Sequence, residues 1–507
     1  MNHFPPGPPR CAVDFKTNRF CDAMDMVPIR LYDTLSREVR DLGPGESGRF
    51  RMYVCGPTVY GPAHLGNFLT FVRFDVLYRL LRLAGYHPLY VRNITDVDDK
   101  TIKGAGEAGI PLGEFTEKWT RRFHEDCTLL NLLTPDEEPR ATDHIREQIE
   151  LVEKLVDTGH AYIGGDGSVY YRVQSFDEYG KLSHFDPQAL RQQATNSGGA
   201  VNLSDEYERD SVADFALWKS RKEADGPVSW ESPWGPGRPG WHLECSAMSL
   251  KYLGSGFDLH GGGEDLCFPH HENEIAQSEA ATGEPFAKHW MHSVHLLVEG
   301  KKMSKSLGNF FILSDLREMG FHPSEIRLAL LGGHYRQQYN FTIAGLEAAR
   351  SGLNKLEGGI GGLLEQAGLD PAGWAGFAQP RLPGEWGPFR NAWEAFRNDL
   401  NTPAVLGALF NGLRKARKEA ANASQARELL KPVGALVYAL GLPLFTRPSG
   451  LAQTKEIPPG VVALAEERWA AKQARDFDRA DRLRAEISAE GWLVVDQPDA
   501  YTLKPKS

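Results

Sequence analysis

The sequence of 507 residues has few cysteines and no long apolar run. Its six cysteines, at positions 11, 21, 55, 127, 245 and 267, are too sparse for a disulfide scaffold. No uncharged apolar run approaches the ~18 residues that a membrane helix needs, and the start, MNHFPPGPPR, has no apolar core of a secretory signal. We therefore expect a cytoplasmic protein with no membrane partner, whose cysteines are free thiols or metal ligands.

Positive charge is not in excess either. Lysine and arginine number 57 against 67 acidic residues, so the formal net charge of −10 excludes a generic polybasic coat for nucleic acid, although not a local basic surface. Hydrophobic residues make up 41% and charged residues 24%, which is typical of a globular protein and excludes wholesale disorder. At ~150 residues per domain, the length predicts about three domains.

The chain from 49 to 94 predicts a strand, a helix and a second strand. RFRMYV (49–54) alternates in polarity, FLTFVRFDVLYRLLRLAGY (68–86) has apolar residues at helical spacing, and PLYVRNI (88–94) is again strand-like. Two strands joined by a helix imply a parallel sheet with a right-handed crossover.

We predict the α/β fold class: a Rossmann-like domain with a parallel sheet, interrupted by an insertion and followed by a helical bundle and a small C-terminal α+β domain. The expected boundaries are a disordered proline-rich tail at 1–26, the first α/β half at 27–140, the insertion at 141–235, the second α/β half at 236–315, a helical segment and linker at 316–386, the bundle at 387–446, and a linker with the last domain at 447–507.

Two short motifs favour phosphate binding. His64-Leu65-Gly66-Asn67 opens the helix after the first strand, where backbone N–H groups attract anions and a glycine lets a flat base approach. The lysine-rich KKMSKSLGN (301–309) follows a strand-like segment, and its ammonium groups can stabilise charge on a leaving pyrophosphate. Taken alone, the first motif also fits a histidine that caps a helix, and the second fits a solvated surface.

Four dispersed residues form a candidate metal site: Cys55, Cys245, His270 and Glu274. Because Pro269 suits the first turn of a helix, His270 and Glu274 are expected on one helix face. His271 has no acid at the same spacing, since position 275 is isoleucine. Two thiolates, an imidazole and a carboxylate suit zinc. From the residues alone, buried free cysteines and a surface His–Glu pair remain the alternative.

HLGN and KMSKS together resemble the ATP signature of class I aminoacyl-tRNA synthetases, and longer segments resemble the cysteinyl-tRNA synthetase family. These segments are YVCGPTVYGPAHLGN, NITDVDDK, PGWHLECSAM, FDLHGGGEDLCFPHHENEIAQSEA, KKMSKSLGNFF, NDLNTPAVLGAL and FDRADRLRAEI. The resemblance covers residues 28–507, and 257–279 is its most specific part. One departure is Asn67, where the class has a second histidine; an amide can still donate to a phosphate oxygen, but without charge.

The resemblance implies activation of L-cysteine by ATP, with Mg²⁺ accompanying ATP, and transfer of the cysteinyl group to the 3′-terminal adenosine of tRNA-Cys. It assigns one zinc ion to the candidate metal site. The residues expected to act on the phosphates are His64, Asn67, Lys302 and Lys305. The residues expected to bind ATP are His64, Gly66, Asn67, His260, Gly261, Gly262 and Lys305.

Three further residues are expected at the amino acid: Thr58, Trp241 and Asp265. Trp241 is also compatible with a core position, and Asp265 with a helix cap. Asp96, Asp98 and Asp99 are interpreted as a turn that positions strand ends, in preference to a metal box. Shape alone separates near-isosteres by only ~1–3 kcal/mol. Zinc binds a thiolate far better than a hydroxyl, so we expect zinc to select cysteine, with Glu274 a weak ligand that leaves room for the substrate sulfur.

A basic surface is expected to bind tRNA, since in the family the bundle and the terminal domain meet the anticodon region. Its cations are Arg414, Lys415, Arg417, Lys418, Arg427 and Lys431. Related enzymes that join cysteine to an amino sugar lack such a module, so the chain after residue 316 argues against that alternative. A non-catalytic RNA-binding relative is not expected to keep both the lysine motif and the metal residues. We expect a monomer.

Overall fold

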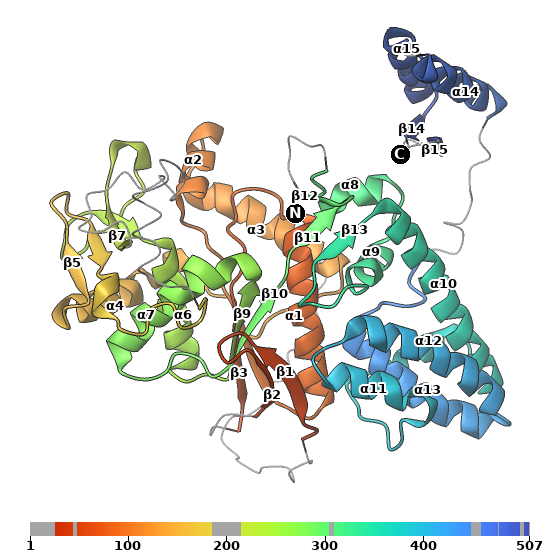
Figure 1. Cartoon of the computed structure of the whole chain (residues 1–507), viewed down its shortest axis with the longest axis horizontal. Helices are drawn as coiled ribbons and strands as arrows, with labels where there is room; N and C mark the ends of the chain where they lie inside the picture. Colours follow the sequence, from red (N-terminus) through yellow and green to blue (C-terminus); the bar gives the residue numbers. More distant parts are fainter. Residues whose placement is uncertain are drawn as a thin grey trace, which may run out of the picture.

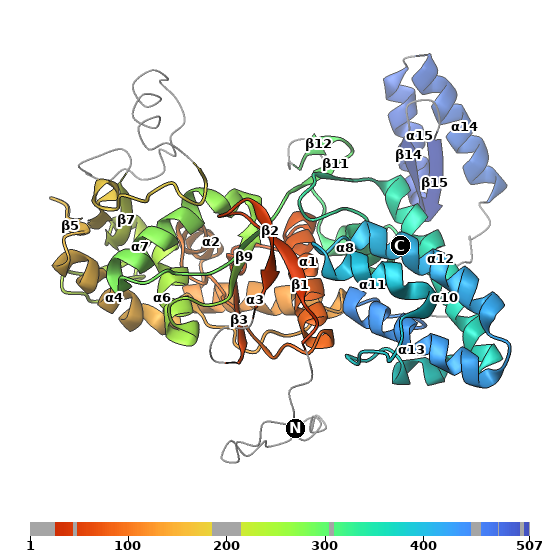
Figure 2. The same cartoon turned by 60° about the horizontal axis from the view of Figure 1, so that its bottom comes forward.

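The computed structural model describes residues 26–43, 48–184, 214–303, 309–447, 458–474, 476–496 and 501–505. A parallel sheet lies at the centre, with the insertion on one side and the helical bundle on the other, as Figures 1 and 2 both show. The predicted α/β fold class is confirmed. Among the described residues, every helix is too short or too polar to serve as a membrane span.

The central sheet consists of β3 (Phe50–Val54), β4 (Pro88–Arg92), β9 (Leu259–Gly263) and β10 (Trp290–Ser293) in the order β10-β9-β3-β4. Every neighbouring pair in it is parallel. From β3 the chain first adds β4 on one side and later adds β9 on the other. The gap between the carboxyl ends of β3 and β9 is therefore the point at which doubly wound sheets bind ligands.

Helix α1 (Leu65–Leu83) makes the predicted crossover from β3 to β4. Fifteen of its nineteen residues are buried, because it lies between the sheet and the bundle. Even its charged residues Arg73, Asp75 and Arg79 are buried. The start of α1 faces the carboxyl end of the sheet, which puts the HLGN motif beside the β3–β9 gap.

The insertion forms a sheet of its own, which its irregular, polar sequence did not predict. Strands β5 (Ala161–Ile163), β6 (Val169–Tyr171), β7 (Phe215–Ser220) and β8 (Gly237–Pro239) are joined in antiparallel order. The polar stretch 196–210 lies outside the described residues. Beyond β8, helices α6 (Trp241–Leu253) and α7 (Glu272–Thr282) return the chain to the central sheet.

The remaining elements complete the α/β part, the bundle and the C-terminal unit. The helices are α2 (Asp99–Ala108), α3 (Leu112–Leu129), α4 (Ile145–Asp157), α8 (Leu313–Glu318), α9 (Pro323–Leu330), α10 (Ile343–Gln366), α11 (Arg390–Arg397), α12 (Thr402–Glu419), α13 (Ala423–Leu440), α14 (Pro459–Gln473) and α15 (Phe477–Ala489). The strands are β1 (Ile29–Asp33), β2 (Glu38–Leu42), β11 (Leu296–Val298), β12 (Lys301–Lys302), β13 (Tyr339–Phe341), β14 (Trp492–Asp496) and β15 (Tyr501–Pro505). The predicted tail lies outside the described residues except at its end, and the exact domain boundaries stay predictions.

A buried ion cluster joins helix α1 beside the central sheet to the bundle. Arg327 on α9 donates to Asp75 on α1 and to the carbonyl oxygen of Leu440 at the end of α13, the latter at 2.9 Å. Arg79 donates to the same carboxylate at 2.8 Å. Gly441, which ends α13 at φ +64°, leaves room for the arginine, because a Cβ there would lie 2.1 Å from Arg327 Nη2. We call Asp75, Arg79 and Arg327 the helix joint.

Candidate active site

The four residues of the candidate metal site come together at the carboxyl end of β3. Cys55 directly follows β3, Cys245 lies on α6, and Glu274 lies on α7. The Sγ atoms of Cys55 and Cys245 are 3.8 Å apart, and His270 Nε2 lies 3.0 Å from Glu274 Oε1. All four side chains are buried. The surface His–Glu alternative is therefore wrong.

The turn before α7 is less regular than the sequence predicts. The helix begins at Glu272, whereas the prediction placed its first turn at Pro269. Phe268 is extended, with φ −137° and ψ 132°, because a residue before proline is disfavoured in the helical region. The expected pairing of His270 with Glu274 is present nonetheless.

This irregular turn also brings His271 into the cluster, which the spacing argument did not predict. Its Nε2 lies 3.3 Å from Cys55 Sγ and 4.0 Å from Glu274 Oε1. Two overlapping groups can therefore hold a metal ion, each with its ligand atoms within 4.8 Å of one another. The predicted group is Cys55, Cys245, His270 and Glu274, and the second group is Cys55, His260, His271 and Glu274.

The environment favours the charged form of Cys245 and Glu274, but not of Cys55 or His271. Hydrogen bonding from Cys55, aided by the nearby His270, lowers the pKa of Cys245, whereas burial raises the pKa of Cys55. Burial alone would raise the pKa of Glu274, but His260 and His270 outweigh it and lower that pKa. Burial also lowers the pKa of His271 well below its ordinary value, so this imidazole is neutral. A thiolate and a carboxylate thus lie side by side in a buried place.

The donor atoms fit a zinc ion. Two thiolates bound at about 2.3 Å to a tetrahedral zinc would be about 3.8 Å apart, and the Cys55 and Cys245 sulfurs are separated by 3.8 Å. The buried negative charge is of the kind that a divalent cation offsets. The cluster is therefore a candidate site for a metal ion.

Two further histidines contact the imidazoles of the cluster, and the sequence analysis predicted neither. His242 Nδ1 lies 2.9 Å from His270 Nδ1, and His292 Nε2 lies 2.8 Å from His271 Nδ1. His292 is in turn 2.8 Å from Thr34 Oγ1. Such partners orient ligand imidazoles. The only sequence signal was the place of His242 in the WHLEC segment, since His292 comes from a strand with no motif of its own.

Of the three residues expected at the amino acid, Trp241 contacts this cluster, whereas the roles of Thr58 and Asp265 stay predictions. The Trp241 ring packs on His270 with centroids 4.4 Å apart, and 37% of Trp241 is exposed, so it is a wall and not a core residue. Thr58 is half-buried and bridges Thr95. Asp265 is exposed in the turn after β9 and is not a helix cap. Its charge acts on His64, although burial dominates and lowers the pKa of that histidine.

The two phosphate motifs lie against each other. His64 pairs with Ile312 across a β-bridge, and a Cβ at Gly66 would lie 3.2 Å from Met303 Cε. His64 also caps α1: Asn67 N–H donates to its Nδ1 at 3.3 Å, and the Asn67 Oδ1 accepts from His64 N–H at 3.0 Å. The capping alternative is therefore present, and it leaves the Asn67 amide NH₂ as the group for a phosphate.

The other expected ATP residues differ in their placement. Lys302 is exposed in β12, whereas Lys305 lies outside the described residues. Gly261 and Gly262 are close to side chains, since a Cβ on them would lie 2.3 Å from Phe74 and 2.8 Å from Leu266. His260 is fully buried, with Nε2 2.8 Å from Glu274 Oε2, so the structure places it in the metal cluster and not on an open nucleotide surface.

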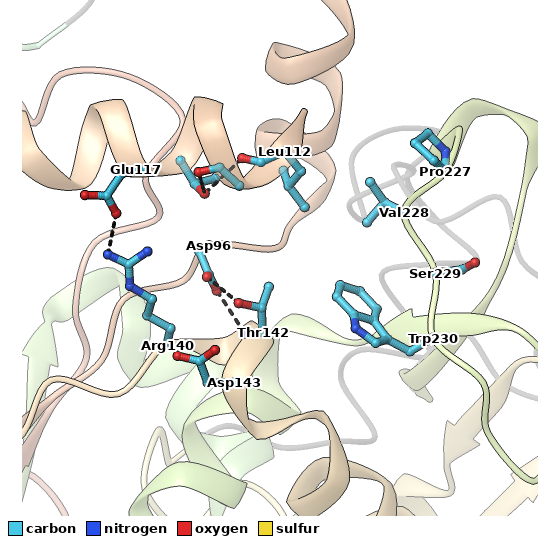
Figure 3. A pocket seen from close by; sticks show the side chains of 12 residues that line it. Asp96, Leu112, Glu117, Arg140, Thr142, Asp143, Pro227, Val228, Ser229 and Trp230 are labelled. Atoms are coloured by element: carbon cyan, nitrogen blue, oxygen red, sulfur yellow. Dashed lines mark hydrogen bonds and ion pairs between the residues drawn. The ribbon is translucent and has the colours of Figure 1, made fainter. Parts of the chain in front are cut away.

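A cavity of about 740 Å³ lies between α3, the turn after β4 and the loop 227–230. Figure 3 shows Val228 and Trp230 facing Asp96 and Thr142 across it. Asp96 accepts from the Thr142 N–H at 3.0 Å and from its hydroxyl at 2.6 Å. Asp98 caps α2, and Asp99 pairs with Lys219 at 3.0 Å. The three aspartates thus make structural contacts, as the turn interpretation expected.

The chain is similar in sequence to a known family and to several of its members. Residues 42–351 match the family described as tRNA synthetases class I (C) catalytic domain. The chain is 49% identical to the cysteine–tRNA ligase of Opitutus terrae over 480 residues, which covers 94% of this chain and 99% of that protein. It is 42% identical to the cysteine–tRNA ligase of Chlamydia muridarum over 484 residues, again covering 94% and 99%.

A solved structure extends the likeness to the fold. The methionyl-tRNA synthetase of Mycobacterium tuberculosis, in complex with methionyl-adenylate, superposes with a TM-score of 0.54 at 16% identity. The match covers 77% of this chain and 89% of that one. The relatives, the family match and the fold agree with the resemblance: the chain belongs to the cysteine–tRNA ligase family of class I aminoacyl-tRNA synthetases and is a ligase.

Proposed function

We propose that this chain activates L-cysteine with ATP and transfers the cysteinyl group to the 3′-terminal adenosine of tRNA-Cys. Family membership supports the reaction class. The observation that carries the choice of amino acid is the pair of cysteine sulfurs, 3.8 Å apart, at the carboxyl end of β3. A cluster with this donor set in the site of an α/β ligase suits a substrate that carries a thiol.

The metal would be one zinc ion held by Cys55, Cys245, His270 and Glu274. When bound, zinc supplies a Lewis acid that takes a thiolate readily and a hydroxyl poorly. Glu274 is the ligand best suited to a weak bond, because its other oxygen is engaged by His260 at 2.8 Å. His242 holds the His270 ring in place.

The amino acid would lie against Trp241, with Asp265 accepting from its ammonium group and Thr58 contacting it from the loop after β3. The partly exposed tryptophan packs on His270 and would form one wall of the amino-acid site.

ATP would lie across the start of α1, with Mg²⁺ on its phosphates. The cysteine carboxylate attacks the α-phosphorus, the bond to the β,γ-phosphates breaks, and pyrophosphate leaves. His64, the Asn67 amide, Lys302 and Lys305 would stabilise the charge that develops on the phosphates, and Gly66, Gly261 and Gly262 would pack on the nucleotide, whereas His260 belongs to the metal cluster. A terminal ribose hydroxyl of tRNA then attacks the carbonyl carbon and AMP leaves.

The bundle would bind tRNA through α12. Arg414, Lys415 and Lys418 line a hollow of about 600 Å³ between α11 and α12, and all three are exposed. Arg427 instead donates to the Ala367 carbonyl oxygen at 3.2 Å, and Lys431 pairs with Glu428. The proposal therefore rests on the α12 cations. The cytoplasmic location and the monomeric state stay predictions.

The function is tested by ATP–pyrophosphate exchange with cysteine or serine, together with zinc analysis. Cys245→Ser is expected to lose the metal and cysteine-dependent exchange by more than 100-fold, whereas Cys267→Ser, outside both metal groups, keeps both. An active protein without zinc, or unchanged exchange in Cys245→Ser, would refute zinc-based selection. A charging assay with tRNA or with glucosaminyl-inositol then separates tRNA ligation from amino-sugar ligation.

The choice between the two metal groups has its own test. His270→Asn is expected to weaken zinc binding more than His271→Asn, because His270 belongs to the group that contains both cysteines, whereas His271 belongs to the group that contains Cys55 alone. Zinc affinity measured with a competing chelator gives the ranking. The opposite ranking would assign the ion to the group with His260 and His271.

A further inference from the structure

An aromatic side chain at the rim of the site is not used by the proposed chemistry. Tyr60 lies on the loop between Cys55 and His64, and 47% of it is exposed. Trp241, the other exposed aromatic near the site, packs on His270 and thus belongs to the metal cluster. Tyr60 lies under a cation instead: the Nζ of Lys100 is 5.2 Å from the centroid of its ring.

The loop that carries Tyr60 is held rigidly to the segment after β4. Gly56 N–H donates to Asn93 Oδ1 at 2.8 Å, Val59 N–H donates to the Thr95 carbonyl oxygen at 3.1 Å, and Thr95 N–H donates to the Pro57 carbonyl oxygen at 3.1 Å. Val59, the residue before Tyr60, is buried, so the backbone that leads into Tyr60 is held in place. The exposed ring is therefore presented by an ordered backbone, and little entropy is lost when a ligand stacks on it.

Lys100 comes from the same fixed region. It is the second residue of α2, directly after Asp98 caps that helix, and its side chain is exposed. Asp99 ties α2 to the insertion through Lys219 and Arg238. An exposed ring with an ammonium group beside it is the combination that binds single-stranded nucleic acid, since the ring stacks on a base and the cation meets a phosphate.

Tyr60 contacts a different element from those expected to hold ATP. Those elements are the start of α1, the end of β9 and the segment that begins at β12, and Met303 and Ile312 connect the last of them to α1. The Tyr60 ring instead faces Lys100 at the start of α2, which follows the edge strand β4. We therefore expect a base stacked on Tyr60 to belong to a nucleic-acid ligand and not to the ATP being activated.

We propose that Tyr60 and Lys100 bind the single-stranded 3′ end of tRNA, with Tyr60 stacking on a base and Lys100 contacting an adjacent phosphate. This inference rests on the proposed function. It assigns Tyr60 and Lys100 as positioning residues for the transfer step, with no part in adenylate formation.

The test compares two reactions in Tyr60→Ala, Tyr60→Phe and Lys100→Gln. Charging of tRNA by Tyr60→Ala is expected to fall about tenfold in kcat/KM, as for the loss of one stacked base. Tyr60→Phe, which keeps the ring, restores most of it. Lys100→Gln is expected to lose several-fold and to show a weaker dependence on salt. ATP–pyrophosphate exchange, which needs no tRNA, stays within twofold. Ile163→Ala, exposed by 54% on the insertion, is the control and stays at wild-type charging.

A binding measurement completes the design. Tyr60→Ala is expected to weaken binding of intact tRNA, and to leave unchanged the binding of tRNA whose single-stranded 3′ end has been removed. Wild-type charging in both Tyr60→Ala and Lys100→Gln would overturn the inference, and so would equal losses with intact and truncated tRNA. A rise in the KM for ATP in exchange would assign the ring to ATP instead. If the wild-type protein shows no exchange with cysteine, the proposed function fails, and the binding measurement still tests the ring.

Discussion

Two buried polar clusters in this chain differ in how their groups are satisfied. In the helix joint, the Asp75 carboxylate meets Arg79 and Arg327 and also accepts from the Leu133 N–H at 2.7 Å. Arg327 donates in addition to the carbonyl oxygens of Leu440 and Leu130. In the metal cluster, by contrast, Cys55, Cys245 and Glu274 crowd together around imidazoles. The residues of both clusters are almost fully buried.

The difference indicates which cluster stabilises the fold and which is suited to bind a ligand. The groups of the helix joint find their partners within the chain. The Asp75 carboxylate accepts from Arg79 and Arg327, and Arg327 also donates to backbone carbonyl oxygens. The metal cluster places two cysteine sulfurs beside the Glu274 carboxylate, which His260 and His270 contact at 2.8 and 3.0 Å. Its groups pair with one another, but they are the sulfur, imidazole and carboxylate atoms that coordinate a metal ion, and an external ligand is therefore expected here.

The largest effect on folding is expected when the helix joint is broken. Arg327→Met leaves the buried Asp75 carboxylate with Arg79 as its one cationic partner in the helix joint and removes the donor to the Leu440 and Leu130 carbonyl oxygens, so the free energy of unfolding is expected to fall by up to about 3–5 kcal/mol. Denaturant unfolding of the variant measures this. Arg146→Met, which removes an exposed pair with Glu150, is the control and is expected to leave the free energy of unfolding nearly unchanged. Similar losses of unfolding free energy in Arg327→Met and Arg146→Met would contradict a stabilising role for the helix joint.

Removal of the metal is expected to act on the other cluster alone. Chelation should abolish cysteine-dependent exchange and loosen α6 and α7, because Cys245 and Glu274 lose their shared partner. Hydrogen exchange should then show faster amide exchange in α6 and α7 and unchanged protection in α13. Equal loss of protection in α13 would mean that the two clusters are one cooperative unit.

Acid should act on the helix joint with a defined sign. Burial alone would raise the pKa of Asp75, but Arg327 and Arg79 outweigh burial and hold it below 3.8. Because the folded pKa is lower than the unfolded value of about 3.9, the carboxylate stabilises the fold above that pH, and the stabilisation is lost as the pH falls through the folded pKa. The stability difference between wild type and Asp75→Asn should therefore shrink below about pH 4. A constant difference across pH 3–6 would contradict this.

The smallest effect is expected at the wall of the metal cluster. Trp241→Ala removes the ring that packs on His270 and should raise the KM for cysteine by about two- to tenfold, since such ring contacts contribute about 0.5–1.5 kcal/mol. Trp241→Phe should restore most of the affinity. Zinc content is expected to stay at wild-type level in both variants, and a loss of zinc would show that the ring supports the metal and not the substrate.

The sequence predicted the parts of the site that depend on local patterns. The strand before Cys55, the helix after His64 and the pairing of His270 with Glu274 all follow from periodicity and spacing. Contacts between residues that lie far apart in the sequence could not be predicted from local patterns. The approach of His260 and His292 depends on how β9 and β10 align, and that of His271 depends on the irregular turn at Phe268. The sheet of the insertion was missed because its strands are short and its turns are polar.

The loop that runs from Cys55 to His64 has a consequence for how this enzyme tolerates change. One end of the loop supplies a sulfur to the metal cluster, and the other end begins the helix that we propose meets the nucleotide. Tyr60 lies between them. A single inserted or deleted residue would shift all three relative to one another, so the length of this connection is expected to be far less variable than its composition.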